Sequence, residues 1–150
     1  MMTRRDVVVA AVAVSVTIAA VALADSAGYP LMGSTVFNWT DLKVVPMKYG
    51  ARRDVFMART PMLERLDCHI TTLNPGEMPH PPKPHDGEEV MIIKEGTVDV
   101  TQKDKTTRVG PGSIIVAMPD EVQGMHNVGT TPATYFVVRW FAPGTLKKTD

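Results

Sequence analysis

The chain has 150 residues, with 16 lysines and arginines against 16 aspartates and glutamates, so its formal net charge is zero. A chain of this length is expected to form about one domain, and the absence of a basic run argues against nucleic acid as a partner. The single cysteine, Cys68, excludes an internal disulfide and zinc sites built on paired cysteines.

The N-terminal segment, residues 1–27, has the pattern of an export signal. Two arginines precede an uncharged, apolar stretch from Val7 to Ala24, which ends in small residues two apart before the polar Asp25 and Ser26. We expect cleavage at the end of this segment, which leaves a domain over residues 28–150 in the periplasm or outside the cell. Thr3–Val8 also resembles the twin-arginine motif of proteins that are exported already folded. The alternative is an uncleaved membrane anchor, which would be the protein's only contact with a membrane.

Short β-type runs separated by turn residues predict an all-β domain after residue 28. The expected strands are Leu66–Leu73, Glu88–Glu95, Thr97–Gln102, Thr106–Val109, Ser113–Met118 and Ala133–Phe141. Pro75–Pro84 contains five prolines, so it is expected to be a rigid, extended loop and not a central strand. Residues 25–50 are expected to form an arm with one or two strands, and Pro119–Gly129 an irregular link. At least six strands at this spacing indicate a sandwich or small barrel.

The alternation of side chains along these strands predicts which residues line the interior. The apolar residues expected to line the cavity or fill the core are Met91, Ile93, Val98, Val100, Ile115, Phe136 and Val138. Cys68 and His69 lie on opposite faces of one strand, so at most one of them lines the cavity. Arg139 could bind a carboxylate, but a surface salt bridge is the expected role.

His85 and Glu89 are the first candidate site. A loop histidine and a strand carboxylate four residues apart can both point into the mouth of a barrel, where they would give an imidazole and a carboxylate to a divalent metal. The structural alternative is a polar loop residue beside a carboxylate that is bonded to the backbone.

Two longer motifs contain this pair. Gly76–Gly96 resembles the first motif of the cupin family, G-x5-H-x-H-x3-4-E-x6-G, and Gly112–Asn127 is similar to the second, G-x5-P-x-G-x2-H-x3-N. The resemblance implies a double-stranded β-helix, or jelly-roll barrel, that binds or transforms a small molecule. It also implies a homodimer formed through exposed edge strands. The family permits dioxygenase, isomerase, lyase or decarboxylase activity, and a non-catalytic sensor or storage domain is the competing class.

The resemblance places the family's ligand positions on this chain one by one. The second histidine of the first motif is His85 and the glutamate is Glu89. The first histidine is replaced by Lys83, and the histidine of the second motif is replaced by Gln123. Counted along a strand from Gln123, His126 points away from the cavity.

Three alternatives follow for the site. In the first, His80 replaces the missing histidine and Gln123 supplies a further ligand beside His85 and Glu89, so that the site holds Fe(II), Mn(II), Ni(II) or Zn(II). In the second, the barrel is metal-free, and Lys83 with Glu89 forms the catalytic pair, with the lysine binding an anionic substrate or acting as a base. In the third, no site survives.

Overall fold

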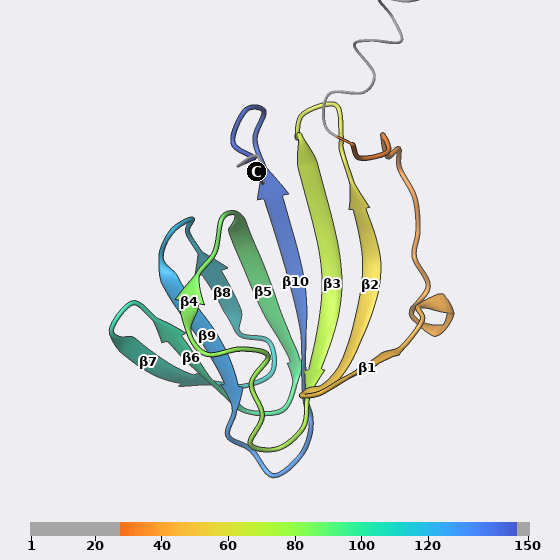
Figure 1. Cartoon of the computed structure of the whole chain (residues 1–150). Coiled ribbons are helices and arrows are strands. Elements are labelled where there is room, and N and C mark those ends of the chain that lie inside the picture. Colours follow the sequence, from red (N-terminus) through yellow and green to blue (C-terminus); the bar gives the residue numbers. More distant parts are fainter. Residues whose placement is uncertain (1–27, 147–150) are drawn as a thin grey trace, which may run out of the picture.

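Two antiparallel sheets make up the computed structural model of the chain, which describes residues 28–146 (Figure 1). The larger sheet has six strands in the order β1-β2-β3-β10-β5-β8, and the smaller has four in the order β4-β9-β6-β7. The predicted export signal, residues 1–27, lies outside the described residues. Within residues 28–146 there is no apolar helix of the length needed to span a membrane.

The strands follow one another with short connections. Their bounds are β1 Val45–Met47, β2 Gly50–Ala58, β3 Arg65–Leu73, β4 Lys83–Pro84, β5 Glu88–Glu95, β6 Val98–Gln102, β7 Lys105–Val109, β8 Ile114–Ala117, β9 Val122–Asn127 and β10 Ala133–Phe141. A single turn of 3-10 helix, η1 (Trp39–Asp41), precedes β1. Lys103 adopts a positive φ of 56° in the tight hairpin between β6 and β7. The all-β jelly-roll architecture predicted from the sequence is confirmed.

The six strands expected from the sequence are confirmed, each with ends within one residue of the predicted ones. The expectation for Pro119–Gly129 is wrong, because Val122–Asn127 forms β9 and pairs with both β4 and β6. Four of its six residues are Gln, Gly, His and Asn, which have little β propensity, so this strand depends on pairing with its two neighbours. Strand β2 was not predicted. The proline-rich loop is extended as expected, and its last two residues form the edge strand β4.

The core lies between the two sheets. Its fully buried members include Leu73, Ile93 and Val98, and Met91, Val100 and Ile115 join them as predicted. Phe136 and Val138 were expected inside, but on β10 the buried alternate residues are Tyr135 and Val137.

An aromatic arm explains why apolar residues occur on the outer face of β10. The ring of Trp39 lies 6.3 Å from that of Phe136, and Phe37 stacks on Phe56 of β2 at 5.3 Å. The arm therefore covers part of the outer face of the six-stranded sheet. Because both faces of β10 are apolar, alternation alone could not distinguish them.

A glycine in β9 lets the proline-rich loop approach the smaller sheet. A Cβ on Gly124 would lie 2.8 Å from Cγ of Pro82, closer than side chains pack. The loop is held in place at its other end by backbone hydrogen bonds between β9 and residues 76–77. The side chains of His80 and Lys83 are thereby brought to the same pocket.

Candidate functional site

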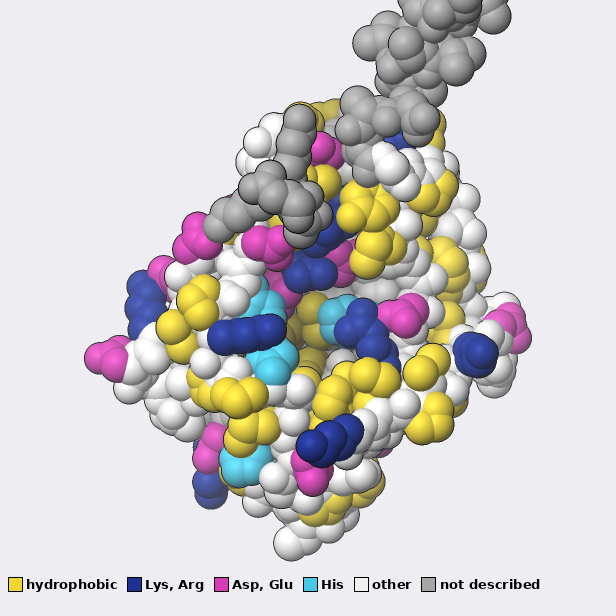
Figure 2. All heavy atoms as spheres, viewed as in Figure 1, with side chains coloured by type: hydrophobic (Ala, Val, Ile, Leu, Met, Phe, Trp, Pro, Cys, Tyr) yellow, Lys and Arg dark blue, Asp and Glu magenta, His cyan; other side chains and the backbone are white. Residues whose placement is uncertain are grey.

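A pocket of about 460 Å³ lies between the two sheets and is lined by residues of β2, β3, β5, β9, β10 and the proline-rich loop. Figure 2 shows histidine and basic side chains gathered around a hollow on this face, with apolar side chains deeper inside. Its walls combine Met91, Met125 and Val137 with charged and hydroxyl groups. A concave, partly apolar pocket with a few polar groups is the usual form of a small-molecule site.

Glu89 is the most buried acidic group of this pocket, with 5% of its surface exposed. Its Oε1 lies 3.5 Å from His85 Nδ1 and 3.7 Å from Arg139 Nη1, and its Oε2 accepts a hydrogen bond of 3.0 Å from Gln123 Nε2. Burial on its own raises the pKa of the Glu89 carboxyl, but the hydrogen bond and charge of His85, with the charge of Arg139, hold that pKa below its ordinary value. Glu89 is therefore a carboxylate at neutral pH.

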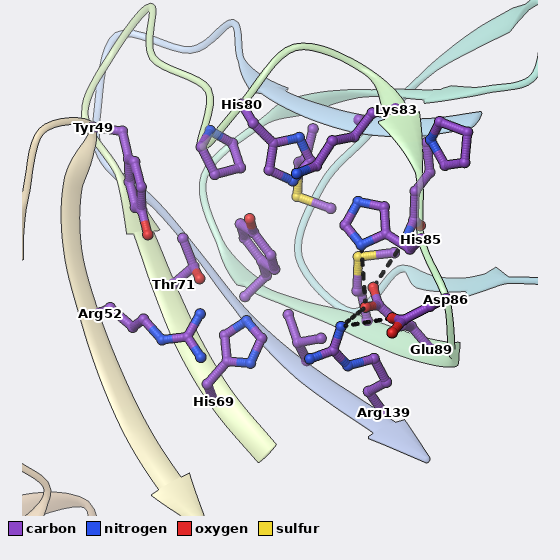
Figure 3. A pocket seen from close by; sticks show the side chains of 18 residues that line it. Tyr49, Arg52, His69, Thr71, His80, Lys83, His85, Asp86, Glu89 and Arg139 are labelled. Atoms are coloured by element: carbon purple, nitrogen blue, oxygen red, sulfur yellow. Dashed lines mark hydrogen bonds and ion pairs between the residues drawn. The ribbon is translucent and has the colours of Figure 1, made fainter. Parts of the chain in front are cut away.

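Arg139 is held at the centre of a row of charges across three strands. It faces Asp67 of β3 on one side and Glu89 of β5 on the other. Asp67 Oδ2 lies 3.3 Å from Arg139 Nε and 3.1 Å from Nε of Arg65. Arg139 also lies 3.5 Å from Asp86 (Figure 3). The expectation of a surface salt bridge for Arg139 is wrong, because this arginine lines the pocket.

His69 lies on the same sheet as Glu89, with β10 between them, and is next to Arg52 (Figure 3). Burial lowers the pKa of His69 to about 4, and the positive charge of Arg52 adds to the effect. The imidazole is therefore neutral at physiological pH. Cys68, on the opposite face of the same strand, does not line this pocket.

Three buried polar atoms of the pocket have no hydrogen-bond partner among the described residues: His69 Nδ1, His85 Nε2 and Gln123 Oε1. Buried polar groups are nearly always paired in folded proteins, so each unpaired one requires an explanation. All three atoms belong to side chains that line the pocket.

The structure brings every site residue predicted from the sequence to this pocket: His80, Lys83, His85, Glu89 and Gln123. The His80 ring lies 5.1 Å from that of His85, and its Nδ1 is 2.8 Å from the carbonyl oxygen of Pro81. Lys83 is directly opposite Gln123 in the β4–β9 pair, but its side chain is exposed and forms no ion pair with the described residues. The cation beside Glu89 is Arg139.

These donors do not face one common point, as a metal ion would require. His85 turns Nδ1 toward Glu89, Gln123 turns its amide nitrogen toward the same carboxylate, and the Arg139 guanidinium is within 4 Å of it. Among the described residues no three His, Cys, Asp or Glu side chains are grouped so that they could hold a metal. The arrangement is therefore suited to hydrogen bonding and proton transfer, and it does not fit metal coordination.

The family model described as a cupin domain matches residues 69–139, which run from β3 to β10 and surround the pocket. Residues 69–139 therefore form a cupin domain. Comparison with curated protein sequences finds no match.

Solved structures, several of them described as cupins, share the fold at low sequence identity. An RmlC-like cupin from Shewanella frigidimarina is 12% identical with a TM-score of 0.61, over 75% of this chain and 95% of that one. The polyketide cyclase RemF from Streptomyces resistomycificus is 20% identical with a TM-score of 0.58, over 74% and 82%. A sugar phosphate isomerase from Silicibacter pomeroyi is 14% identical with a TM-score of 0.57, over 73% and 77%. These similarities establish the fold of this cupin.

The residues of the second cupin motif alternate between the two faces of β9, as predicted from the sequence. Gln123 and Met125 face the pocket, whereas His126 points outward and lies 3.1 Å from the carbonyl oxygen of Gly76. Asn127, the last motif residue, is fully buried and bonds the backbone of Leu73 at the end of β3 and of Gly129 and Thr131 in the loop before β10. Its role in this cupin is structural.

Arg52, Asp86 and Arg139 are the charged pocket residues that the sequence analysis missed. Alternation could not place Arg139 in the pocket, because both faces of β10 are apolar. No indication existed for Arg52 either, because β2 was not predicted as a strand.

Proposed function

We propose that this cupin is a metal-independent enzyme that moves a proton on a small molecule bound between its sheets, with His85 as the acid-base group. The observation that carries the proposal is the buried pair of His85 and Glu89. Glu89 faces Nδ1 at 3.5 Å, and Nε2 on the other edge of the ring is buried without a partner. A base that is oriented by a second group is the usual arrangement in proton-transfer sites.

The residues around the pair have separate roles in this mechanism. The Glu89 carboxylate accepts a hydrogen bond from the Nδ1–H of His85, and this tautomer leaves the lone pair of Nε2 free to take a proton from the bound molecule. Gln123 and Arg139 bind the carboxylate and keep it ionised. Figure 3 shows His85 between Glu89 on one side and His80 with Lys83 on the other. The reacting group of the ligand would therefore lie beside His80 and Lys83.

The fold is compatible with such chemistry. Cupins of similar structure include a polyketide cyclase and a sugar phosphate isomerase, both of which act on small molecules. An isomerisation or an elimination needs a proton to be removed from one atom and returned to another or to the leaving group, which one oriented imidazole can do.

A metal-dependent enzyme is the second candidate. One observation favours it: His80, His85, Glu89 and Gln123 line the same pocket, so a rearrangement of side chains could bring them around an Fe, Mn, Ni or Zn ion. The two candidates differ in whether a chelator abolishes the reaction.

Deuterium exchange tests the proposal without knowledge of the substrate. The purified protein is incubated in D2O with a panel of small carbon acids, and mass spectrometry detects deuterium gained or product formed. We expect exchange on at least one probe, its loss by about a hundredfold or more in His85→Gln, and no loss after treatment with a chelator. The matched control is His126→Gln, which changes a histidine outside the pocket and should keep full activity.

Two results would contradict the proposal. If His85→Gln exchanges as fast as the wild type, or if no probe is exchanged, the pocket does not perform this proton transfer. If the chelator abolishes the activity and one metal ion per chain restores it, the metal-dependent candidate is correct.

We also propose that the protein acts outside the cytoplasm, in the periplasm or the medium. The support is the export pattern of residues 1–27, which includes the twin arginines Arg4 and Arg5. Fractionation of cells that express the full chain tests it, and retention of an Arg4→Lys, Arg5→Lys variant in the cytoplasm is the expected result.

A homodimer is the assembly that we propose. Strand β8 is an edge of the six-stranded sheet, and its outward Ile114 and Val116 are 67% and 49% exposed. Ile92 is paired with Ile114 and adds to the same apolar strip. An exposed apolar edge strand favours pairing with a second copy. Light scattering of the wild type and of Ile114→Glu tests it, with a monomeric variant as the expected result.

A further inference from the structure

We propose that the molecule bound in the pocket is a small monocarboxylate, and that Arg52 binds its carboxylate group on the wall opposite His85. This inference rests on the proposed function, since it concerns the same pocket. It adds the chemical class of the ligand and a residue that determines specificity.

The two terminal nitrogens of Arg52, Nη1 and Nη2, are available to such a ligand. Its Nε donates a hydrogen bond of 2.6 Å to Asp54, and its terminal nitrogens form no hydrogen bond among the described residues. Figure 3 shows the guanidinium pointing from β2 toward His69, along the pocket wall. A guanidinium with free terminal nitrogens is the group best shaped to bind a carboxylate.

Further polar groups surround this position. The hydroxyl groups of Tyr49 and Thr71 line the same wall, and the neutral His69 presents the buried, unpartnered Nδ1. Tyr135 bonds Thr71 and keeps a raised pKa because of its burial, so it remains protonated. A carboxylate at Arg52 would therefore have neutral hydrogen-bonding groups beside it.

The charges of the pocket favour one negative charge on the ligand. Its charged lining residues, apart from the histidines, are three cations (Arg52, Lys83 and Arg139) and two anions (Asp86 and Glu89), an excess of one positive charge. Asp54 pairs with Nε of Arg52 but does not line the pocket, so the lining itself keeps this excess of one positive charge. A dianion such as a phosphate monoester would face Glu89 and Asp86 with a charge that the pocket does not balance.

Because Arg52 and His85 lie on opposite sides of the pocket, they set the orientation of the ligand. The carboxylate is bound at Arg52, and the remainder of the molecule passes over Met91 and Val137 to the His85 edge. Lys83 at the exposed edge of the pocket attracts the anion from solution. In this orientation the carboxylate is recognised by a residue that takes no part in the proton transfer.

Paired probes test the inference. A series of carboxylic acids, from acetate to hexanoate with benzoate and phenylacetate, is compared with the primary amide of each acid, first by thermal shift and then by calorimetry. The amide has nearly the same shape and lacks only the charge. We expect at least one acid to bind about tenfold or more tightly than its amide. The Arg52→Gln variant should lose this preference for the acid over its amide, and the Arg52→Lys variant should retain part of it.

The matched control is Arg53→Gln. Arg53 is adjacent in sequence but lies on the outer face of the sheet, over the Trp39 ring, so the preference for acids should be unchanged. The inference is overturned if no acid binds more tightly than its amide in the wild type, or if Arg52→Gln keeps the preference. His85→Gln separates this result from the proposed function, because it should lose the exchange activity and retain carboxylate binding.

Discussion

The buried carboxylate of Asp67 gives the sharpest test of how this site is held together. Asp67 is 2% exposed, and its Oδ2 lies 3.1 Å from Arg65 Nε and 3.3 Å from Arg139 Nε. Replacing it with asparagine keeps the shape of the side chain and removes the charge. Two arginines, of which Arg65 is 9% exposed, then lose their shared counter-ion.

The cost can be estimated from the effect of breaking a buried ion pair, which is about 3 to 5 kcal/mol when one charged partner is left without compensation. The asparagine oxygen can still accept one hydrogen bond, and Arg139 keeps Asp86 and Glu89 nearby. The lower end, about 3 kcal/mol, is therefore expected. For a domain of this size that corresponds to a fall in Tm of roughly 10 °C.

Thermal and urea unfolding of Asp67→Asn measure this cost, with Asp99→Asn as the matched control. Asp99 also binds an arginine through two hydrogen bonds, of 2.8 and 3.0 Å from Arg108, but this pair lies on the surface. Its substitution should leave Tm almost unchanged. If both variants melt within about 2 °C of the wild type, the row of charges from Arg65 to Glu89 does not stabilise the fold.

Two more predictions concern pH and the proline-rich loop. Since the pKa of His69 falls from 6.5 unfolded to about 4 folded, its contribution to stability is complete above pH 6.5 and is lost as the pH falls toward 4. Urea unfolding should show that the free energy of unfolding is lower at pH 5 than at pH 7 by on the order of 2 kcal/mol in the wild type, and that this difference is absent from His69→Gln. Equal losses in both proteins would contradict the burial of the imidazole. Gly124→Val should push Pro82 away from β9 and weaken the binding of carboxylic acids about tenfold or more. The control Gly110→Ala, whose Cβ meets no atom within 4 Å, should leave binding unchanged. Unchanged binding in Gly124→Val would show that the loop does not shape the pocket.

Much of the fold could be predicted from the sequence because its strands carry strong local signals. Runs such as Glu88–Glu95 and Ala133–Phe141 are rich in β-branched and aromatic residues and end at glycine or proline. Strand β9 carries no such signal: its glutamine, glycine, histidine and asparagine form a strand because β4 and β6 lie on either side. A strand of that kind follows from tertiary pairing, which local propensity does not contain.

The sequence by itself determined the β architecture and the proline-stiffened loop. Motif spacing placed Lys83, His85, Glu89 and Gln123 at one end of a barrel, and His80 was a candidate on the loop beside them. Only the tertiary structure decided what surrounds Glu89. Arg139 is fifty positions away from it in the chain, yet lies directly opposite it across two paired strands. Arg52 and His69 reach the pocket from strands earlier in the chain. The charge balance of the pocket, and with it the class of ligand proposed here, depends on these long-range pairings, which no local pattern specifies.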